Sequence, residues 1–275
     1  MANKKIAASI VIYNTAQSDL QASIACVANS IVDVIYVIDN ALNNDLQNSL
    51  QNLSNKIVYI QGHGNIGYGA GHNIGIRKAV LEDAEYHLVL NPDIEFASCV
   101  IDFLFNYIEA NPSVGYVMPK IIYPDGELQY LCKLLPTPFD LIVRRFFPNV
   151  KLFRKLNYKY ELRHSGYNEI INPPCLSGCF MFLNLNVVEK HNIYFDERFF
   201  MYCEDFDLVR RIHRVAKTIY YPNVSVVHKH AKESYRSRKL MILHIKSAIK
   251  YFNKWGWFFD KERRMLNKQI LDEIK

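Results

Sequence analysis

The 275-residue sequence has no long hydrophobic run. None of its apolar stretches approaches the roughly 18 to 20 residues that a membrane-spanning helix needs, and the run at residues 6–12 is too short for the core of a signal peptide. Half of the residues are nevertheless hydrophobic and 13% are aromatic, which is enough to fill a substantial core. We therefore expect a globular protein located in the cytoplasm.

Cysteine pairs with a diagnostic spacing are also missing. The six cysteines are scattered, and the closest pair, Cys175 and Cys179, has a C-x3-C spacing that suits neither a zinc knuckle nor a redox motif. We expect buried, reduced thiols.

Two common nucleotide-binding motifs are absent. The glycine-rich segment GHGNIGYGAGHNIGI at 62–76 lacks the Gly-Lys-Ser/Thr of a P-loop. It is also not a GxGxxG after the first strand with a ribose-binding acid about 20 residues further on. These absences argue against a P-loop ATPase and an NAD dehydrogenase. The glycines instead allow a close backbone approach to a ligand, and a helix is predicted from about 71 to 83.

Positive charge is concentrated at the C-terminal end. The chain carries a net charge of +6, but residues 229–275 hold 13 Lys and Arg against 5 Asp and Glu, a net +8, which leaves −2 for residues 1–228. Such asymmetry indicates an anionic partner for the tail, either a membrane surface or a nucleic acid.

Short β-branched runs alternate with helix-length segments. The runs are residues 6–12, 34–38, 57–60 and 87–90. This alternation is typical of an α/β protein with a mostly parallel central sheet that is flanked by helices. Ligands of such sheets bind beyond the carboxyl ends of the strands.

Polar residues follow every one of these runs. They are Tyr13-Asn14, Asp39-Asn40, the glycine-rich segment and Asn91-Pro92-Asp93. Any one of them alone is ordinary turn chemistry. Four such polar segments at the carboxyl ends of the strands, which form one rim of the sheet, predict a polar ligand.

The segment LNPDIEF at 90–96 places a carboxylate at the end of a buried strand beside a rigid proline. Mg²⁺ and Mn²⁺ favour one or two carboxylates together with phosphate oxygens, so Asp93 is a candidate for holding a cation against a diphosphate, with Glu95 as a helper. The alternative is a helix-entry turn.

The segment MYCEDFDLVRR at 201–211 crowds three carboxylates beside aromatic side chains and in front of two arginines. Acids in a first helical turn interact well with the positive end of the helix dipole, so a helix start is one interpretation. It does not explain why aromatic residues surround the acids.

The sequence resembles the inverting glycosyltransferases of family 2 with a GT-A fold, particularly the rhamnosyltransferase-like branch that builds bacterial surface polysaccharides. The matching segments are VIYN (11–14), VIDN (37–40), GNIGYGAGHNIGI (64–76), LNPDIEF (90–96), LSGCFMFL (176–183), FDERFFMYCEDFDLVRRI (195–212) and VVHKHAKES (226–234). Their order and spacing carry the resemblance over most of residues 6–234. It implies a GT-A, Rossmann-like catalytic domain over 1–233, followed by a basic amphipathic helical segment over 234–275.

The resemblance assigns a donor site and a metal site. The residues implied to hold the nucleotide-sugar are Asn14, Asp39, Asn65, Gly67, Asn73 and Asn91. Asp93 matches the last position of the metal-binding DxD motif, which implies Mg²⁺ or Mn²⁺, and His228 is implied to approach the same metal or the diphosphate. Asn91 stands where a strict DxD motif has its first Asp, so the site carries less negative charge.

His228 and His230 lie on alternate residues after the strand-like run 224–227. A lone histidine is more often structural than a metal ligand, and only one of these two is expected to face the site. The resemblance assigns that position to His228.

Inverting transfer needs a base in line with the anomeric carbon, on the face opposite the leaving group, and a carboxylate is the usual choice. The resemblance gives Asp205 as this base, with Glu204 orienting it or binding acceptor hydroxyls. A neighbouring carboxylate and an apolar wall both raise a carboxyl pKa, and aromatic faces stack on sugar rings. Asp207 is expected to form helix-face ion pairs with Arg210 and Arg211.

Basic and aromatic residues are interleaved in an expected insertion at about 133–164. They are Lys133, Arg144, Arg145, Lys151, Arg154, Lys155, Lys159 and Arg163 with Phe139, Phe146, Phe147, Phe153, Tyr158 and Tyr160. This mixture suits an anionic lipid interface, or alternatively the stacking of single-stranded nucleic acid.

A helical stripe follows residue 234. Met241, Ile245, Ala248 and Phe252 have the 4, 3, 4 spacing of one helix face, and the flanking cations are Lys246, Lys250 and Lys254. The stripe predicts either docking on the catalytic domain or contact with a membrane.

The sequence as a whole predicts an inverting glycosyltransferase. We expect a dTDP- or UDP-sugar donor, with dTDP-rhamnose as one candidate, and a lipid-linked saccharide acceptor in O-antigen or capsule synthesis, used at the inner face of the cytoplasmic membrane. A non-catalytic nucleic-acid-binding protein is the alternative, although an acidic site would repel phosphate unless a metal intervened.

Overall fold

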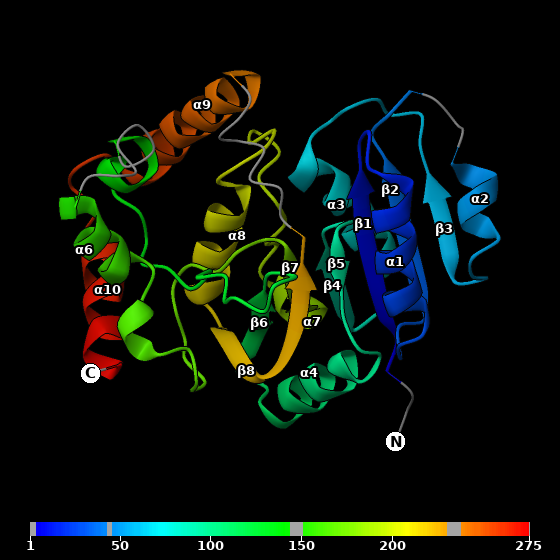
Figure 1. The fold of residues 1–275 in the computed structure, drawn as a ribbon, viewed down its shortest axis with the longest axis horizontal. Coiled ribbons are helices and arrows are strands. Elements are labelled where there is room, and N and C mark those ends of the chain that lie inside the picture. Colours follow the sequence, from blue (N-terminus) through cyan, green and yellow to red (C-terminus); the bar gives the residue numbers. More distant parts are fainter. Residues whose placement is uncertain (1–3, 43–45, 144–150, 230–237, 275) are drawn as a thin grey trace.

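The computed structural model describes residues 4–42, 46–143, 151–229 and 238–274, and within them eight strands form one sheet (Figure 1). The strands are β1 (Ile6–Ile12), β2 (Val34–Asp39), β3 (Ile57–Ile60), β4 (Tyr86–Leu90), β5 (Ile94–Glu95), β6 (Val114–Ile122), β7 (Phe180–Asn184) and β8 (Lys217–His228). β1 and β3 coincide with the predicted runs, and β2 and β4 are each one residue longer. The α/β prediction is confirmed.

The sheet order is β3-β2-β1-β4-β7-β6-β8-β5. β3, β2, β1 and β4 are parallel neighbours, whereas β7 runs antiparallel between β4 and β6. β8 is parallel to β6, and the end of β8 pairs with the two-residue strand β5. Because Ile94 lies opposite His228 in that pairing, the fold brings the LNPDIEF segment to the last residue of β8.

Helices cover the sheet and extend beyond it. They are α1 (Gln17–Ala28), α2 (Gln47–Gln51), α3 (Tyr68–Leu81), α4 (Cys99–Ala110), α6 (Lys151–Tyr160), α7 (Leu185–Lys190), α8 (Glu204–His213), α9 (Arg238–Trp255) and α10 (Lys261–Glu273), with short helical turns η1 (Phe139–Val143) and η2 (Arg163–Ser165). In Figure 1, α6, α9 and α10 lie on the side of α8 away from β1, β2 and β3. The predicted C-terminal helical extension thus consists of two helices.

The helix expected at about 71–83 begins earlier, at Tyr68, and ends at Leu81. Gly67, at φ +92°, makes the turn into it. Within the helix, a Cβ on Gly75 would lie 2.7 Å from the Cβ of Ser9, so this glycine lets α3 pack tightly on β1. The glycines therefore serve helix packing as well as the loop.

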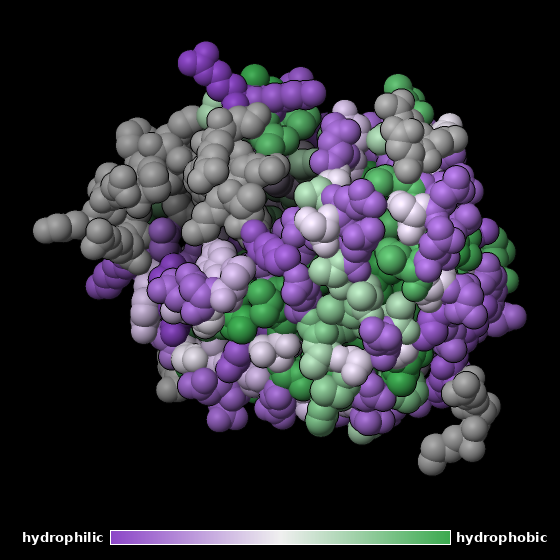
Figure 2. Space-filling view, turned by 45° about the vertical axis from the view of Figure 1, so that its right-hand side comes forward, coloured by the Kyte–Doolittle hydropathy of each residue, from purple (hydrophilic) through white to green (hydrophobic). Residues whose placement is uncertain are grey.

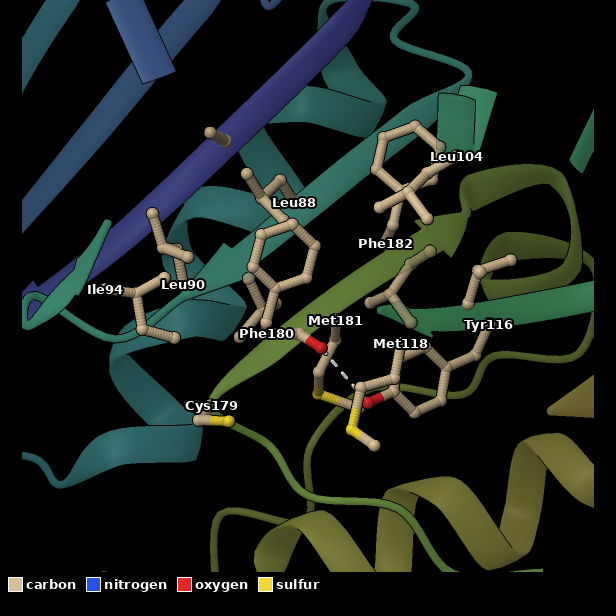
Figure 3. Packing of buried hydrophobic residues seen from close by; sticks show 14 of the residues in the cluster. Leu88, Leu90, Ile94, Leu104, Tyr116, Met118, Cys179, Phe180, Met181 and Phe182 are labelled. Carbon is tan, nitrogen blue, oxygen red and sulfur yellow. Dashed lines mark hydrogen bonds between the residues drawn. The ribbon is translucent and has the colours of Figure 1, made fainter. Parts of the chain in front are cut away.

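The core lies on both faces of β4 and β7. Figure 3 shows Phe180 and Phe182 on the side of β7 toward Leu88, while Met181 points the other way, toward Met118. This alternation is the two-residue period of a strand buried on both faces.

The cysteines are mostly buried, and the surface is of mixed polarity. All six thiols are free; Cys132, Cys175, Cys179 and Cys203 are buried as expected, whereas Cys99 is exposed. On the face shown in Figure 2, hydrophobic side chains are interspersed with hydrophilic ones. Among the described helices, none is long and apolar enough to cross a membrane.

A buried polar cluster joins β1, α3 and β4. The hydroxyl of Ser9 lies 2.7 Å from Nδ1 of His72 and 2.7 Å from Nε2 of His87, and all three residues are buried. Burial lowers the pKa of His87 to about 3, and burial with the nearby His87 lowers the pKa of His72 well below its usual value. Both rings are therefore neutral in the folded protein at neutral pH.

Acid should destabilise the fold through these two histidines. The unfolded chain binds protons below about pH 6.5 and the folded rings do not, so stability falls by about 1.4 kcal/mol per pH unit per histidine as the pH drops below that value. In urea unfolding, His87→Leu should lose about 2 kcal/mol less than the parent between pH 6.5 and 5. The exposed His164→Gln should follow the parent, and equal pH slopes for all three proteins would contradict the prediction.

Candidate active site

The polar rim predicted from the sequence exists. Asn14 follows β1, Asp39 ends β2, and Asn91 and Asp93 follow β4. These three strands are parallel neighbours, so their carboxyl ends meet at one edge of the sheet. Polar groups at this edge are positioned to receive a ligand.

Asp39 is held firmly at this edge. One of its carboxylate oxygens accepts a hydrogen bond from the backbone N–H of Ala41 at 2.8 Å, and the other accepts from the hydroxyl of Tyr59. The neighbouring Asn40 donates to the carbonyl of Gly67 at 3.1 Å. The end of β2 is therefore tied to the glycine-rich segment.

The glycine-rich segment also contacts the chain directly before the carboxylate-rich segment at 201–211, which we call the acidic motif. Gly67 donates to the side chain of Asn65 at 3.2 Å, and Tyr68 donates its N–H to the carbonyl of Phe200 at 2.9 Å. A Cβ on Gly67 would lie 2.2 Å from that carbonyl oxygen, so only glycine fits. The positive φ and the close contact with Phe200 therefore both require glycine at position 67.

Asn14 and Asn73, which the resemblance also places at the donor site, differ in their surroundings. Asn14 is exposed and has a positive φ of 52°, so its side chain is open to solvent at the rim. Asn73 is buried in α3, where its amide donates to the carbonyl of Phe195 and to Glu197 and accepts from the N–H of Phe195, each at 2.9 Å. Asn73 therefore fixes the segment that leads into the acidic motif.

Asp93 and His228 face one another across the β5 and β8 pairing. Nε2 of His228 lies 3.4 Å from a carboxylate oxygen of Asp93 and 3.4 Å from the amide nitrogen of Asn91. The other ring nitrogen, Nδ1, lies 3.0 Å from Oε1 of Gln129. Gln129 thus fixes the ring with Nε2 directed at Asp93. His230 lies outside the described residues.

This arrangement fits a divalent cation bound jointly with a diphosphate. No group of three or more His, Cys, Asp or Glu side chains in the described ranges could enclose a metal by itself. One carboxylate and one imidazole suffice where phosphate oxygens supply the remaining ligands, and Gln129 is the outer partner that ligating histidines usually have.

The His228 ring binds a proton strongly, and this proton competes with a cation for Nε2. Burial would lower the pKa of this ring, but the neighbouring Cys179 and Asp93 raise it to about 10. A bound cation would replace the proton on Nε2. Glu95, expected as a helper, instead forms an ion pair with Lys229 at 2.6 Å, and Lys229 also binds Asp19 at 3.0 Å.

Glu204 and Asp205 begin α8 directly after a tight turn. Tyr202 and Cys203 both have positive φ, 69° and 65°, and this turn points the helix start inward. Glu204 is buried, and its Oε2 has no hydrogen-bond partner among the described residues. Burial, with the charge of Asp205, raises the pKa of Glu204 well above its usual value.

Asp205 is anchored by backbone donors. Its two carboxylate oxygens accept from the N–H of Gly178 at 3.1 Å and from the N–H of Phe206 at 2.9 Å. Burial raises the pKa of Asp205, while the Gly178 N–H and the positive charge of Lys133 act in the opposite direction. A Cβ on Gly178 would lie 2.9 Å from the Cβ of Asp205, so this glycine makes room for the acid.

Tyr68 is bound to the same stretch of backbone as Asp205. Its hydroxyl donates to the carbonyl of Gly178 at 2.8 Å. Burial raises the pKa of Tyr68, and Cys179, Glu204, Asp205 and Asp93 raise it further. Gly178 therefore links Tyr68, which donates to its carbonyl, with Asp205, which accepts from its N–H.

The aromatic side chains of the acidic motif serve chiefly as core. Phe199 and Cys203 are buried with Ala248, Tyr251 and Phe252 of α9 in a second hydrophobic cluster, and Tyr202 and Phe206 pack against it. The stripe of α9 thus docks on the protein at Ala248 and Phe252. Phe199, which is 1% exposed, has no face free to stack on a sugar ring.

Asp207 is buried on α8 and joins the C-terminal helices. It accepts from Arg211 Nε at 2.8 Å and from Trp255 Nε1 at 2.9 Å, and it pairs with Lys254 at 2.5 Å. The predicted ion pair between Asp207 and Arg211 is confirmed. Lys254, expected to flank a surface stripe, is an internal partner.

Arg210 does not pair with Asp207 as predicted. It is 1% exposed and binds Asp260 through two hydrogen bonds of 2.8 Å, and it binds Glu262 at 2.6 Å. The guanidinium group lies 4.1 Å from the centre of the Trp255 ring. The helix that carries the acid pair is thereby clamped to α10.

Tyr68, Gln129, Lys133 and Gly178 had no assigned role at this site in the sequence analysis, which placed Lys133 only in the basic and aromatic segment at 133–164. Tyr68 and Gly178 lie inside matched motifs, where their positions alone could have drawn attention. Gln129 and Lys133 lie outside every motif and reach the site only through long-range packing. In the 133–164 segment, residues 144–150 lie outside the described residues.

Known proteins share both the sequence pattern and the fold of this site. The sequence model described as Glycosyl transferase family 2 matches residues 8–185. The rhamnosyltransferase WbbL of Escherichia coli (strain K12) is 28% identical over 220 residues, which cover 75% of each chain. The N-acetylglucosaminyl-diphospho-decaprenol L-rhamnosyltransferase of Mycobacterium tuberculosis is 26% identical over 188 residues, 62% of this chain and 58% of that protein.

Solved structures share the fold at lower identity. The structure of GalNAc-T7 with UDP, GalNAc and Mn²⁺ matches with a TM-score of 0.60 and 15% identity, over 82% of this chain and 43% of that one. Staphylococcus aureus TarS 1–349 matches with a TM-score of 0.57 and 14% identity, over 98% of this chain and 70% of that one. These neighbours have the GT-A fold, and this chain spans less than half of the first.

Removing the ion pair of Arg210 with Asp260, which clamps α8 to α10, should lower the free energy of unfolding. Asp260→Asn keeps the helix-capping group of α10 but leaves Arg210 without its buried bidentate partner, and removing one partner of a buried pair costs about 3–5 kcal/mol. Urea unfolding measures the loss. As a control, Glu85→Gln removes a partly exposed pair with Lys4 and should cost less than about 1 kcal/mol. Equal losses would contradict the assigned role of Arg210.

Proposed function

This chain belongs to glycosyl transferase family 2, and from that premise we propose that it transfers a sugar, with inversion, from a nucleotide-sugar to a lipid-linked saccharide. The observation that carries the proposal is the backbone at Gly178 and Cys179, which binds Asp205 and Tyr68 on one side and Asn91, close to Asp93, on the other. Inverting transfer requires a base opposite the departing diphosphate, and the buried carboxylate of Asp205 is suited to this role.

The donor occupies the rim in this proposal. Asp39 and Asn65 bind the nucleoside, Asn14 and Asn91 lie nearby, and the backbone around Gly67 approaches it closely. Asn73 supports the site from within the fold. The rhamnosyltransferase relatives favour dTDP-rhamnose among dTDP- and UDP-sugars.

Asp93 and His228 hold Mg²⁺ or Mn²⁺ against the donor diphosphate, and Gln129 orients the imidazole. The cation, when bound, neutralises negative charge on the departing diphosphate. The GalNAc-T7 structure contains Mn²⁺ together with UDP, which supports a metal in this fold. With Asn91 in place of an acid, the protein contributes a single carboxylate.

Asp205 acts as the general base. It takes the proton of the acceptor hydroxyl while the hydroxyl oxygen forms a bond to the anomeric carbon and the bond to the nucleoside diphosphate breaks on the opposite face. The backbone N–H groups of Gly178 and Phe206 fix the carboxylate, and its raised pKa makes it a stronger base. Glu204 orients the acceptor or the base.

One relative supports the proposed acceptor and location. The name of the mycobacterial relative specifies a diphospho-decaprenol substrate, which supports a lipid-linked acceptor. We propose that this acceptor belongs to O-antigen or capsule synthesis. An enzyme with such an acceptor would work at the inner face of the cytoplasmic membrane. Membership of a glycosyltransferase family argues against the nucleic-acid-binding alternative.

Replacing the base tests the reaction directly. Asp205→Asn preserves size and one of the two backbone hydrogen bonds but removes the proton acceptor, so turnover should fall by roughly 10²-fold or more with unchanged affinity for the donor. Turnover of dTDP-rhamnose and calorimetric donor binding are the two measurements. Glu189→Gln, an exposed acid on α7, is the control. Near-normal turnover of Asp205→Asn would reject the assignment.

Replacing Asp93 tests the metal. Asp93→Ala should weaken nucleotide-sugar binding chiefly in the presence of Mn²⁺ or Mg²⁺, and EDTA should remove the difference between variant and parent, because the carboxylate acts through the cation. Calorimetry with and without metal measures this. Glu95→Ala, which loses only the ion pair with Lys229, is the matched control. An unchanged metal response in Asp93→Ala would identify Asp93 as a turn residue.

A further inference from the structure

Two adjacent aromatic side chains protrude from the loop between α9 and α10. Phe258 is 68% exposed and Phe259 is 90% exposed, and Met265 nearby on α10 is 61% exposed. Single exposed apolar residues are ordinary, but neighbouring phenylalanines on one tight loop form an apolar projection that interacts with something other than water.

The loop is held rigidly in this exposed position. The indole of Trp257 donates to Asn253 at 2.9 Å, and Arg263 donates to the carbonyls of Trp257 and Phe258 at 3.2 and 3.5 Å. Asp260 closes the loop by capping α10 through the N–H of Arg263 at 2.9 Å. The phenylalanines are therefore presented by a fixed scaffold.

A groove of about 950 Å³ lies beside the loop. It combines aromatic and basic side chains, with Tyr158, Trp257 and Phe258 next to Lys159, Arg264 and Lys268. Arg264 and Lys268 are one helical turn apart on α10, and both are exposed. Lys261, also exposed, follows the loop directly.

We propose that Phe258, Phe259, Met265, Lys261, Arg264 and Lys268 form an anchoring surface that docks on an anionic phospholipid bilayer. Aromatic rings partition to the depth of lipid headgroups, and cations around them pair with lipid phosphates. The anionic partner is favoured by charge complementarity, since Asp272 is the single acid among the described residues that line the groove.

This inference deepens the proposed function, because it supplies the surface through which an enzyme with a lipid-linked acceptor meets the membrane. It also moves that surface away from α9. Lys254 pairs with Asp196 and Asp207 inside the protein, and Lys250 donates to the carbonyl of Arg198. The cations of α10 and the loop aromatics replace them.

Co-sedimentation with vesicles tests the anchoring surface. The parent protein should pellet with phosphatidylglycerol vesicles at low salt, be partly released at high salt and pellet far less with phosphatidylcholine vesicles. Phe258→Ser with Phe259→Ser should abolish most of the binding. Arg264→Gln with Lys268→Gln should weaken it roughly 10- to 30-fold, since each cation contributes about 1 kcal/mol.

Matched controls separate the surface from general exposure and charge. Phe103→Ser removes a phenylalanine of α4 that is 50% exposed, and Lys190→Gln with Lys217→Gln removes two exposed cations elsewhere. These variants should bind vesicles like the parent. Normal binding by the double phenylalanine variant, or equal losses in the controls, would overturn the proposal.

Fluorescence gives an independent measurement. Trp257 lines the groove, so its emission should shift to the blue with anionic vesicles and be quenched by brominated lipid, and Trp257→Phe should remove both signals while Trp255 remains inside the clamp. No shift in the parent would count against docking by this surface.

The outcomes distinguish this proposal from the proposed function. The double phenylalanine variant should transfer sugar to a short soluble acceptor at the parent rate, because the loop contacts neither Asp93 nor Asp205. A parent that catalyses transfer but ignores vesicles would overturn the anchoring surface alone. Vesicle binding that depends on Phe258 and Phe259, with no loss of turnover in Asp205→Asn, would overturn the assigned base alone.

Discussion

The backbone at Gly178 and Cys179, where the chain enters β7, joins the parts of the candidate site. The N–H of Gly178 binds Asp205, its carbonyl accepts from Tyr68, and the carbonyl of Cys179 accepts from the N–H of Asn91 at 2.9 Å. One short stretch of backbone thus sets the acid pair, the glycine-rich segment and the metal edge relative to one another. Since a side chain at position 178 would displace Asp205, the arrangement depends on a residue that contributes no side chain.

Helix α8 carries a second constraint, because acids at its start face the site and charged groups further along bind α9 and α10. A buried charge is costly unless it is paired and hydrogen-bonded, and Arg210 meets this condition with Asp260, Glu262 and the Trp255 ring. A lysine could not replace it, since only the planar guanidinium binds a carboxylate in two places and stacks on an indole. The C-terminal helices therefore belong to the architecture that holds Asp205 in position.

The sequence was informative where chemistry is local. Strands β1 to β4 follow from runs of β-branched residues, and the polar rim follows because parallel strands end at one edge. Partners distant in sequence could not be predicted this way. The contact of Gln129 with His228 spans 99 residues, and Arg210 meets Asp260 across 50. The spacing of Asp207, Arg210 and Arg211 allowed two helix-face pairs, but burial of Arg210 against α10 selected only one.

The net charge of the C-terminal segment likewise did not reveal where its exposed cations lie. Among the described residues of 229–275, Lys254 and Arg263 bind internal partners while other cations are exposed on both α9 and α10, so total charge could not locate the anchoring surface. That surface and the clamp share α10: Asp260 caps the helix and binds Arg210, while Arg264 lies one turn further on. A bilayer that binds the loop would therefore act on a helix rigidly connected to α8. Docking by this surface would therefore fix the orientation of Asp205 relative to the membrane, and with it the direction from which a lipid-linked hydroxyl would reach the proposed base.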